Sequence, residues 1–343
     1  YSGPSWNRYF NPDLTWEVGE KINLGLDLQL FNDFNLTFDI FREKRRDIFM
    51  TRENSIPEIV GTGETKITSN NGEMENKGLD LAIDYNKQIT KDFFLSFKST
   101  LTFARNKVLK MDEPPYFEYP GLSDVGHPLG TYWGYVADGL FPDQETIDNS
   151  PRQDLGYTPQ PGDIKYVNQP NAKGEYDNVI NSNDRVAIGH PYDPELVYGF
   201  GPSMKWKNWD FSFFFQGVAR TSFMMYGMHP FGTTSIKNML QFVADDHWSV
   251  DNPNPNAAYP RLTKDSNGNN DQYSTYWLRN AAFLKLKNAE IGYTYKGMRF
   301  YLSGVNLLTF SPFKHWDPEM GGGNGLYYPT QRVFNIGFQM TIQ

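Results

Sequence analysis

The stretch Glu17-Val-Gly-Glu-Lys-Ile-Asn-Leu-Gly-Leu-Asp-Leu-Gln-Leu-Phe31 decides the fold class. Every second residue from Ile22 to Leu30 is apolar, and the residues between them are polar or glycine. Alternation at a period of two is typical of a β-strand with one apolar and one polar face. Only Asn32-Asp33 separates this stretch from a second alternating run, Phe34 to Ile48. The two runs together predict a pair of antiparallel strands joined by a tight turn.

Further runs of this kind are joined alternately by tight turns and by long polar loops. We expect the other tight turns at Thr90-Lys91, Lys207-Asn208 and Lys296-Gly297. The loops between the pairs have about 28, 85, 60 and 20 residues, far more than connections in a compact soluble domain. The chain has about nine such runs, each long enough for a tilted strand to cross a membrane. This pattern is typical of an all-β, antiparallel transmembrane barrel with short periplasmic turns and long extracellular loops.

The composition agrees with a barrel. The 343 residues have a net charge of -8, a mean hydropathy of -0.60, and no apolar stretch long enough for a membrane helix. A polar average is expected because only every second strand residue of a barrel faces lipid. The absence of cysteine excludes disulfides and thiol chemistry. The acidic balance argues against a nucleic-acid partner, which would require a basic surface.

The alternate strand residues that are polar form one face of the sheet, and this face is expected to line the lumen of the barrel. Its charged residues are Lys21, Asp27, Asp39, Asp80, Asp84, Lys98 and Asp210. In an open channel they would set ion selectivity, and in a plugged barrel some would hold the plug. Because an open sheet edge would leave backbone groups unpaired in lipid, we expect further strands to precede Tyr1.

Six phrases then occur in a recognisable order. They are Asn11-Pro-Asp-Leu-Thr-Trp-Glu17, Gly162-Asp-Ile-Lys-Tyr-Val167 followed by Asn183-Asp-Arg-Val-Ala-Ile-Gly189, Asp251-Asn-Pro-Asn-Pro-Asn-Ala-Ala-Tyr-Pro-Arg-Leu262, Ala282-Phe-Leu-Lys-Leu-Lys-Asn288, Ser303-Gly-Val-Asn-Leu-Leu-Thr-Phe310 and Trp316-Asp-Pro-Glu319. Together they resemble the C-terminal part of SusC/RagA-like TonB-dependent transporters of the Bacteroidota. The resemblance implies a plugged barrel of about 22 strands. Residues 1–343 would form its C-terminal part, with the N-terminal plug domain and the earlier strands outside this chain.

The resemblance also implies a function and partners. Such a protein would lie in the bacterial outer membrane, in contact with its lipid, and would import oligosaccharides or peptides. A SusD-like lipoprotein would be its partner at the cell surface. TonB would supply energy through the missing N-terminal part. Two alternatives stay open: a passive porin-like channel, and a SusC-like barrel recruited as a scaffold in an outer-membrane complex. A soluble carbohydrate-binding protein is disfavoured, because apolar faces such as that of Phe93 to Phe103 would be exposed to water.

The loops contain one candidate metal site. Members of the family often carry Asp-x-Asn-Gly-Asp-Gly after the Gly-Asp-Ile-Lys-Tyr phrase. Here the corresponding segment is Asn168-Gln-Pro-Asn-Ala-Lys-Gly174, which lacks the carboxylates that a hard cation requires. Asp163, Asn181, Asn183 and Asp184 could still supply oxygens to calcium, and the other interpretation is a plain turn-rich loop. No other cofactor is expected.

Loop aromatics are the candidate ligand-binding residues. The set is Trp133, Tyr135, Trp248, Tyr259, Trp277, Trp316 and Tyr327. Their flat amphipathic rings can lie against sugar faces or peptide side chains, while the polar tips form hydrogen bonds. Each could instead pack inside a loop or touch the lipoprotein.

We expect no enzymatic activity. Asp245-Asp246-His247 and His315-Trp316-Asp317 place acidic groups beside histidine, but the sequence has no His-Glu-x-x-His pattern. It also has no Gly-x-Ser-x-Gly elbow and no phosphate-binding Gly-x-x-x-x-Gly-Lys loop.

Overall fold

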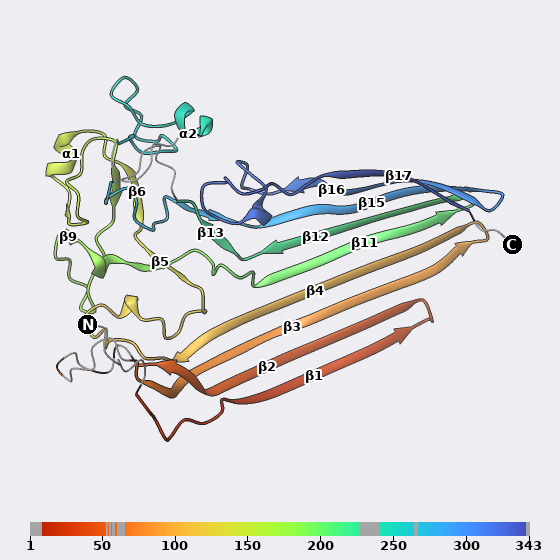
Figure 1. Cartoon of the computed structure of the whole chain (residues 1–343), viewed down its shortest axis with the longest axis horizontal. Coiled ribbons are helices and arrows are strands. Elements are labelled where there is room, and N and C mark those ends of the chain that lie inside the picture. Colours follow the sequence, from red (N-terminus) through yellow and green to blue (C-terminus); the bar gives the residue numbers. More distant parts are fainter. Residues whose placement is uncertain are drawn as a thin grey trace, which may run out of the picture.

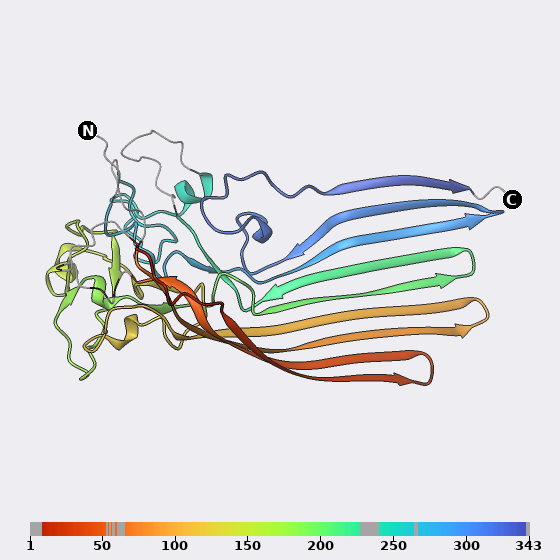
Figure 2. The same ribbon diagram turned by 60° about the horizontal axis from the view of Figure 1, so that its bottom comes forward.

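The computed structural model describes residues 9–52, 54, 56, 59, 66–226, 240–263 and 267–340. Its long strands form one nine-stranded antiparallel sheet in the order β1-β2-β3-β4-β11-β12-β15-β16-β17. Their bounds are β1 Val18–Leu30, β2 Phe34–Thr51, β3 Thr68–Thr90, β4 Phe93–Lys110, β11 Leu196–Trp206, β12 Trp209–Ala219, β15 Phe283–Tyr295, β16 Met298–Phe310 and β17 Val333–Met340. The strands lie side by side as a long curved wall, with the long loops gathered beyond one end and the tight turns at the other (Figures 1 and 2).

The register of the sheet shows why the alternating sequence forms this wall. Leu26, Phe38, Leu81, Leu101 and Tyr198 pair in succession from β1 to β11 and so form one row across the sheet. The apolar side chains on this face of the sheet are exposed, as the 72% exposure of Leu24 illustrates. An apolar face of this extent requires lipid around it.

The turn end of the same face carries a row of aromatic rings. It consists of Phe93, Trp206, Trp209, Tyr293, Phe300 and Phe338, each paired with the next from β4 to β17. Aromatic rings gather at the level of the lipid headgroups, so the row is a girdle of the kind that membrane barrels carry.

The tight turns lie where the sequence predicts them. Lys207 has a φ of 52°, and Lys296 and Gly297 have φ values of 47° and 79°. Positive φ at these positions matches the twist of two-residue hairpin turns.

The loops contain short elements of their own. These are η2 Pro120–Leu122, β5 Tyr132–Gly134, β6 Ala137–Leu140, α1 Gln144–Asp148, β7 Arg152–Gln153, β8 Ile164–Tyr166, β9 Val179–Ile180, η3 Ser182–Asp184, β10 Val186–Ile188, β13 Ser222–Met224, α2 Gln241–Asp245, β14 Leu278–Asn280 and η4 Pro318–Met320. Within the described residues, every helix is too short and too polar to cross a membrane.

Candidate ligand-binding site

The long loops pack together around an apolar core of their own. Short strands join segments that are distant in the sequence: β5 pairs with β10, and β13 pairs with β14. The core includes Leu140, Ile164, Ile180, Phe223, Val243 and Phe313. Because this core is close-packed, the side chains at its surface have fixed positions.

Four of the predicted ligand-binding aromatics lie inside this core instead of facing solvent. Tyr135, Trp248, Tyr259 and Trp277 are all buried. Rings pack directly on one another there: the centroids of Tyr259 and Trp277 are 6.3 Å apart, and Tyr135 lies 5.2 Å from Tyr166. The structural reason is that large rings supply most of the apolar area with which these loops can form a core. Tyr135 and Trp248 are therefore packing residues, whereas Tyr259 and Trp277 also line a cavity described below.

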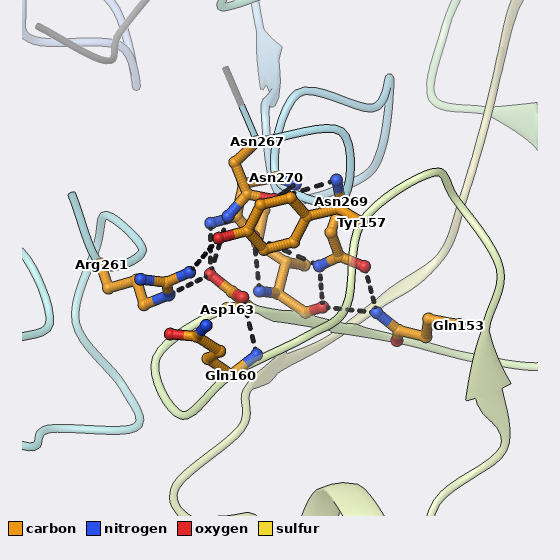
Figure 3. A network of polar contacts seen from close by, with 9 residues as sticks. Gln153, Tyr157, Gln160, Asp163, Arg261, Asn267, Asn269 and Asn270 are labelled. Carbon is orange, nitrogen blue, oxygen red and sulfur yellow. Dashed lines mark hydrogen bonds and ion pairs between the residues drawn. The ribbon is translucent and has the colours of Figure 1, made fainter. Parts of the chain in front are cut away.

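The loop core is fixed by a buried carboxylate. Asp163 is fully buried and accepts hydrogen bonds from Arg261 Nε at 2.7 Å, Asn267 Nδ2 at 3.0 Å and Asn270 Nδ2 at 2.9 Å. The backbone N–H of Gln160 donates a further bond of 2.8 Å. Figure 3 shows these donors converging on Asp163. A buried charge is stabilised only when it is paired and its lone pairs are used, and here both conditions are met.

A second set of buried amides continues this network (Figure 3). Gln153 Nε2 donates to Asn269 Oδ1 at 2.5 Å and to the carbonyl oxygen of Ile164 at 3.0 Å. Asn269 in turn donates to the same carbonyl at 2.8 Å, and the Tyr166 hydroxyl donates to the Asn269 carbonyl at 2.7 Å. The network joins the segment 153–166 to the segment 261–270, although about 100 residues separate them in the chain.

The predicted calcium ligands lie at two different places. Asp163 belongs to the network above, whereas Asp184 accepts backbone N–H bonds from Gln169 at 2.7 Å and Asn181 at 2.8 Å. The Asn181 side chain accepts from Asn183 N and caps η3. Burial raises the pKa of Asp184 above its usual value. In the described part of the chain, no three acidic or histidine side chains are grouped so that they could hold a metal ion. Calcium stays a prediction.

A hollow lined by tyrosines lies at the surface of the loops. Its cavity has a volume of about 340 Å³. The lining residues are Tyr132, Tyr192, Tyr226, Tyr273, Tyr327, Met224, Met320, Gly321 and Gly322. We call this the tyrosine hollow. Its tyrosines come from three loops, namely the one between β4 and β11, the one between β12 and β15, and the one between β16 and β17.

The floor of the tyrosine hollow is made of glycine backbone. Gly321 and Gly323 have φ values of 77° and 96°, which residues other than glycine rarely adopt. A Cβ on Gly322 would lie 2.4 Å from the carbonyl oxygen of Met224, so this position has no room for a side chain. Gly323 N donates to the same carbonyl at 2.8 Å, and Tyr226 N donates to Gly323 O at 3.1 Å. The glycines thus bring the last loop against the β13 segment and leave the rings of the hollow uncovered.

The tyrosine hollow offers rings and hydroxyl groups without formal charge. Among the described residues that line it, none is acidic or basic. Burial raises the pKa of Tyr132 to about 12. The hydrogen-bonding contact with Tyr327 raises the pKa of Tyr226 above its usual value. Both phenols are therefore neutral at physiological pH. The site suits a neutral ligand with apolar faces and many hydroxyl groups.

An apolar cavity of about 210 Å³ adjoins the tyrosine hollow. The two share Tyr226 and Tyr273 as a common wall. Other parts of the cavity wall are Met225, Val243, Leu262 and Trp277, together with Arg261, whose charge is paired with Asp163. A ligand that occupies the hollow could extend into this second space.

The remaining predicted aromatics have three different environments. Trp133 donates from Nε1 to Asp124 Oδ1 at 2.6 Å and packs edge-on against His127. Trp316 donates from Nε1 to the Gly321 carbonyl at 2.9 Å, so it holds the glycine floor in place. Tyr327 lines the hollow itself.

The last loop is anchored by a buried lysine. Lys285 has a side-chain exposure of 0%, and its Nζ lies 2.6 Å from Asp317 Oδ2 and 2.5 Å from Glu319 Oε2. Lys287 also binds Glu319, at 2.7 Å, and Thr330 donates to Asp317. Burial by itself would raise the pKa of both carboxyl groups. The hydrogen bonds from Lys285, Lys287 and Thr330 outweigh it and hold both pKa values below their usual range. Two of the sequence motifs that resemble the transporter family, Ala282–Asn288 and Trp316–Glu319, therefore contact each other through these ion pairs.

The predicted lumen-facing residues fall into lateral pairs on the polar face of the sheet. Asp39 lies opposite Asp80 in the register, and Asp80 accepts from Thr102 at 2.6 Å. Asp84 lies 3.6 Å from Lys98. The other three also have neighbours on this face. Lys21 Nζ lies 3.6 Å from Glu43 Oε2, and Asp27 is opposite Thr37 in the register. Asp210 accepts a hydrogen bond from Arg299 Nε. Whether they line an open or a plugged lumen stays a prediction.

The predicted ligand-binding set lacks four tyrosines of the hollow: Tyr132, Tyr192, Tyr226 and Tyr273. The last three are single exposed tyrosines in irregular sequence, and only the packing of three loops brings the four together. The run Gly321-Gly322-Gly323 was the one local signal, since consecutive glycines indicate a close backbone approach.

The histidines near acidic residues have structural roles. His247 Nδ1 lies 2.8 Å from the Ala244 carbonyl oxygen. His315 stacks on Phe242, with ring centroids 4.3 Å apart, and burial lowers its pKa.

Comparisons with known proteins identify the barrel. Residues 1–136 match the family model described as TonB dependent receptor-like, beta-barrel. The TonB-dependent receptor P26 of Formosa agariphila is 28% identical, with 99% of this chain and 36% of the relative aligned. The TonB-dependent receptor SusC of Bacteroides thetaiotaomicron is 26% identical, covering 99% of this chain and 33% of that protein. The chain thus spans about a third of the length of these curated relatives.

Solved structures show the same fold. The RagAB peptide importer in its open-open state aligns with a TM-score of 0.74 over 98% of this chain and 36% of its own, at 20% identity. In its closed-closed state the TM-score is 0.71. The expectation of an all-β transmembrane barrel with long extracellular loops is confirmed. Residues 1–136 thus match the TonB-dependent receptor β-barrel model, and nearly the whole chain is similar to SusC-like TonB-dependent receptors of the bacterial outer membrane.

Proposed function

We propose that this chain is part of a TonB-dependent importer that carries oligosaccharides or peptides across the outer membrane. Coupling to TonB and capping of the long loops by a SusD-like lipoprotein belong to the same proposal. Similarity to TonB-dependent receptors supports the transport function. RagAB, whose fold this chain shares, is a peptide importer, so peptides remain within the proposal.

The observation that carries the proposal is the tyrosine hollow. Five tyrosines from three separate loops surround one space above a glycine floor. A ligand in this space would touch all three loops, which gives a direct route from binding to loop movement. Loops held by a rigid barrel are common positions for ligand recognition.

Among the two substrate classes, the chemistry of the hollow favours neutral oligosaccharides. Sugar rings present apolar C–H faces and hydroxyl groups, which match tyrosine rings and phenol groups. A charged peptide would find no charged partner among the described lining residues of the hollow.

The test is binding by the full-length transporter purified in mild detergent. We expect it to bind a member of a panel of neutral glucan, mannan or xylan oligosaccharides, measured by isothermal titration calorimetry. Tyr226→Ala and Tyr273→Ala should each weaken binding by about two- to tenfold, since one ring contact contributes about 0.5–1.5 kcal/mol. Both rings are about half exposed, so the fold should be unaffected.

Tyr176→Ala is the matched control, because Tyr176 is an exposed loop tyrosine that does not line the hollow. It should bind like the wild type. Binding of a tryptic peptide mixture in place of every oligosaccharide would reassign the substrate class. Binding that survives loss of both Tyr226 and Tyr273 rings would show that the ligand site lies elsewhere.

Whole-cell uptake separates import from passive diffusion. We expect uptake of the bound oligosaccharide to stop when the proton-motive force is collapsed. Continued uptake under those conditions would indicate the porin-like channel, and no uptake in energised cells would favour a scaffold role.

A further inference from the structure

The outward face of β1 to β4 changes from apolar to basic within one row. The register gives the apolar row Leu24, Ile40, Leu79 and Phe103, which continues to Leu196 of β11. The next row on the same face, one step nearer the long loops, is Ile22, Arg42, Lys77 and Arg105. No bulge interrupts the pairing between these two rows, so their side chains point to the same side of the sheet.

Three cations therefore lie side by side on adjacent strands. Arg42 is opposite Lys77, and Lys77 is opposite Arg105. Their side chains are 59%, 67% and 53% exposed. Like charges directly opposite one another destabilise a sheet, so this row lacks an explanation in strand pairing alone.

More cations border the row. Lys44 and Lys107 belong to the row beyond it, on either side of Glu75. The guanidinium of Arg220 lies 5.8 Å from the ring of Phe103, at the edge of the apolar row. We call this set the basic belt: Arg42, Lys44, Lys77, Arg105, Lys107 and Arg220.

Internal carboxylates balance only part of this charge. Arg42 pairs with Glu75 at 2.5 Å and Lys44 with Glu73 at 3.1 Å. Arg105 and Arg220 share the buried Glu195, at 3.1 and 2.6 Å. Glu20 lies opposite Lys44 in the outer row, so six cations face four carboxylates, and the surplus is two positive charges in a chain whose net charge is -8. Arg46, one row farther out, pairs with Glu20 and Asp47.

Two lysines have little or no compensation. Lys77 lies 3.8 Å from Glu75, whose carboxylate already binds Arg42 at shorter distance. Lys107 is exposed and forms no ion pair with the residues that the structure describes. Both have long side chains that can reach along the surface of the barrel.

We propose that the basic belt binds the phosphate groups of phosphorylated glycolipid in the outer leaflet. The belt lies directly above the lipid-facing rows and on the side of the extracellular loops, which is the depth of the outer headgroups. Arginine and lysine at this depth keep their stems on the apolar surface and hold anionic oxygens with their ends. A phosphate between Lys77 and Arg105 would replace the repulsion within the row by attraction.

The strands themselves provide a wall for the rest of the headgroup. β2 continues to Thr51 and β3 begins at Thr68, so paired backbone extends well beyond the belt. The sugars of a glycolipid would lie against ordered strands there.

The experiment is a lipid titration of the full-length transporter, freed of endogenous lipid in mild detergent and followed by native mass spectrometry. The probes are phosphorylated lipid A and the same lipid with its phosphates removed. We expect the wild type to prefer the phosphorylated form. Lys77→Gln combined with Lys107→Gln should weaken that binding by about thirtyfold, since each of the two cations near an anionic lipid surface contributes about 1 kcal/mol.

The matched control is Lys87→Gln combined with Lys91→Gln, two lysines near the tight turn at the other end of β3. It removes the same charge and should bind like the wild type. Neither pair is buried, and circular dichroism and heat-modifiable migration should show folded barrels for both. Equal affinity of the belt variant and the wild type, equal loss in the control, or no preference for the phosphorylated lipid would each overturn the proposal. Competition by inorganic phosphate at equal concentration would assign the belt to free anions and would also overturn it.

Discussion

Gly322 lies in the floor of the tyrosine hollow at a position with no room for a side chain. A methyl group there would meet the Met224 carbonyl oxygen at 2.4 Å, within the contact that joins the last loop to β13. We expect Gly322→Ala to destabilise the loop by about 1–3 kcal/mol and to weaken ligand binding, because the backbone must move apart. Thermal unfolding and ligand titration of the full-length protein check this.

Gly121→Ala is the control for that substitution. Gly121 has no positive φ, and its nearest neighbour would be Val186 Cγ1 at 3.9 Å. Its effect should stay within about 0.5 kcal/mol. Equal behaviour of the two variants would show that the glycine floor does not position the hollow.

The roles of individual loop aromatics could not be predicted from the sequence. Tyr132 and Tyr135 are three residues apart in the same loop, yet one lines the hollow and the other is buried in the loop core. Tyr135 is held in the core by a backbone hydrogen bond to Tyr273 and by the ring of Tyr166, both distant in the chain. Residue type indicates that a ring will be partly buried, but only tertiary packing decides which face stays exposed.

The loop between β16 and β17 is the element whose attachment is most sensitive to charge. Lys285 holds Asp317 and Glu319 from a fully buried position. Lys285→Met should lower the opening free energy of residues 311–332 by about 3–5 kcal/mol, since it leaves two partly buried carboxylates with fewer partners. Lys287→Met removes a more exposed partner of Glu319 and should lower the same opening free energy by about 1 kcal/mol or less. Hydrogen-exchange protection of this loop measures both.

The loop between β16 and β17 should also become less stable at acidic pH. The pKa values of Asp317 and Glu319 are lowered in the folded protein, so their contribution to stability is present above their usual pKa values near 4. That contribution is lost as the pH falls through the lowered values, because protonated carboxyl groups leave Lys285 buried without a counter-charge. Loop protection should therefore decrease below about pH 4 in the wild type and change less in Lys285→Met. An equal decrease in both would contradict this assignment.

The sequence predicts most long strands closely and the short ones not at all. One prediction for a long strand was wrong: the loop expected to have about 28 residues spans only 52–67, because β3 begins at Thr68, in polar sequence without visible alternation. The alternating run Glu17–Phe31 is β1 Val18–Leu30, and the tight turn at Lys207-Asn208 lies between β11 and β12. Strands such as β7 Arg152–Gln153 have too few residues for a period to be visible. Their positions depend on buried amides such as those of Gln153, which local sequence does not reveal.

For the whole molecule, the depth of each row in the membrane makes a prediction about insertion. Leu81 lies in a central row of the apolar face, whereas Ile22 lies in the row of the basic belt. Leu81→Arg should reduce the free energy of unfolding from a bilayer by about 2–4 kcal/mol, and Ile22→Arg by about 0–1 kcal/mol. Denaturant titration of the full-length barrel in lipid vesicles compares them. Equal losses would show that the two rows do not differ in depth.

The composition of the tyrosine hollow has a consequence for biogenesis. Its five rings come from loops that follow β4, β12 and β16, so no single hairpin carries a usable part of the site. The hollow exists only when these strands have been threaded and paired in the correct register. If the hollow binds the substrate as proposed, binding at the cell surface reports that the barrel is complete: a barrel arrested during insertion would display its loops but would not bind the substrate.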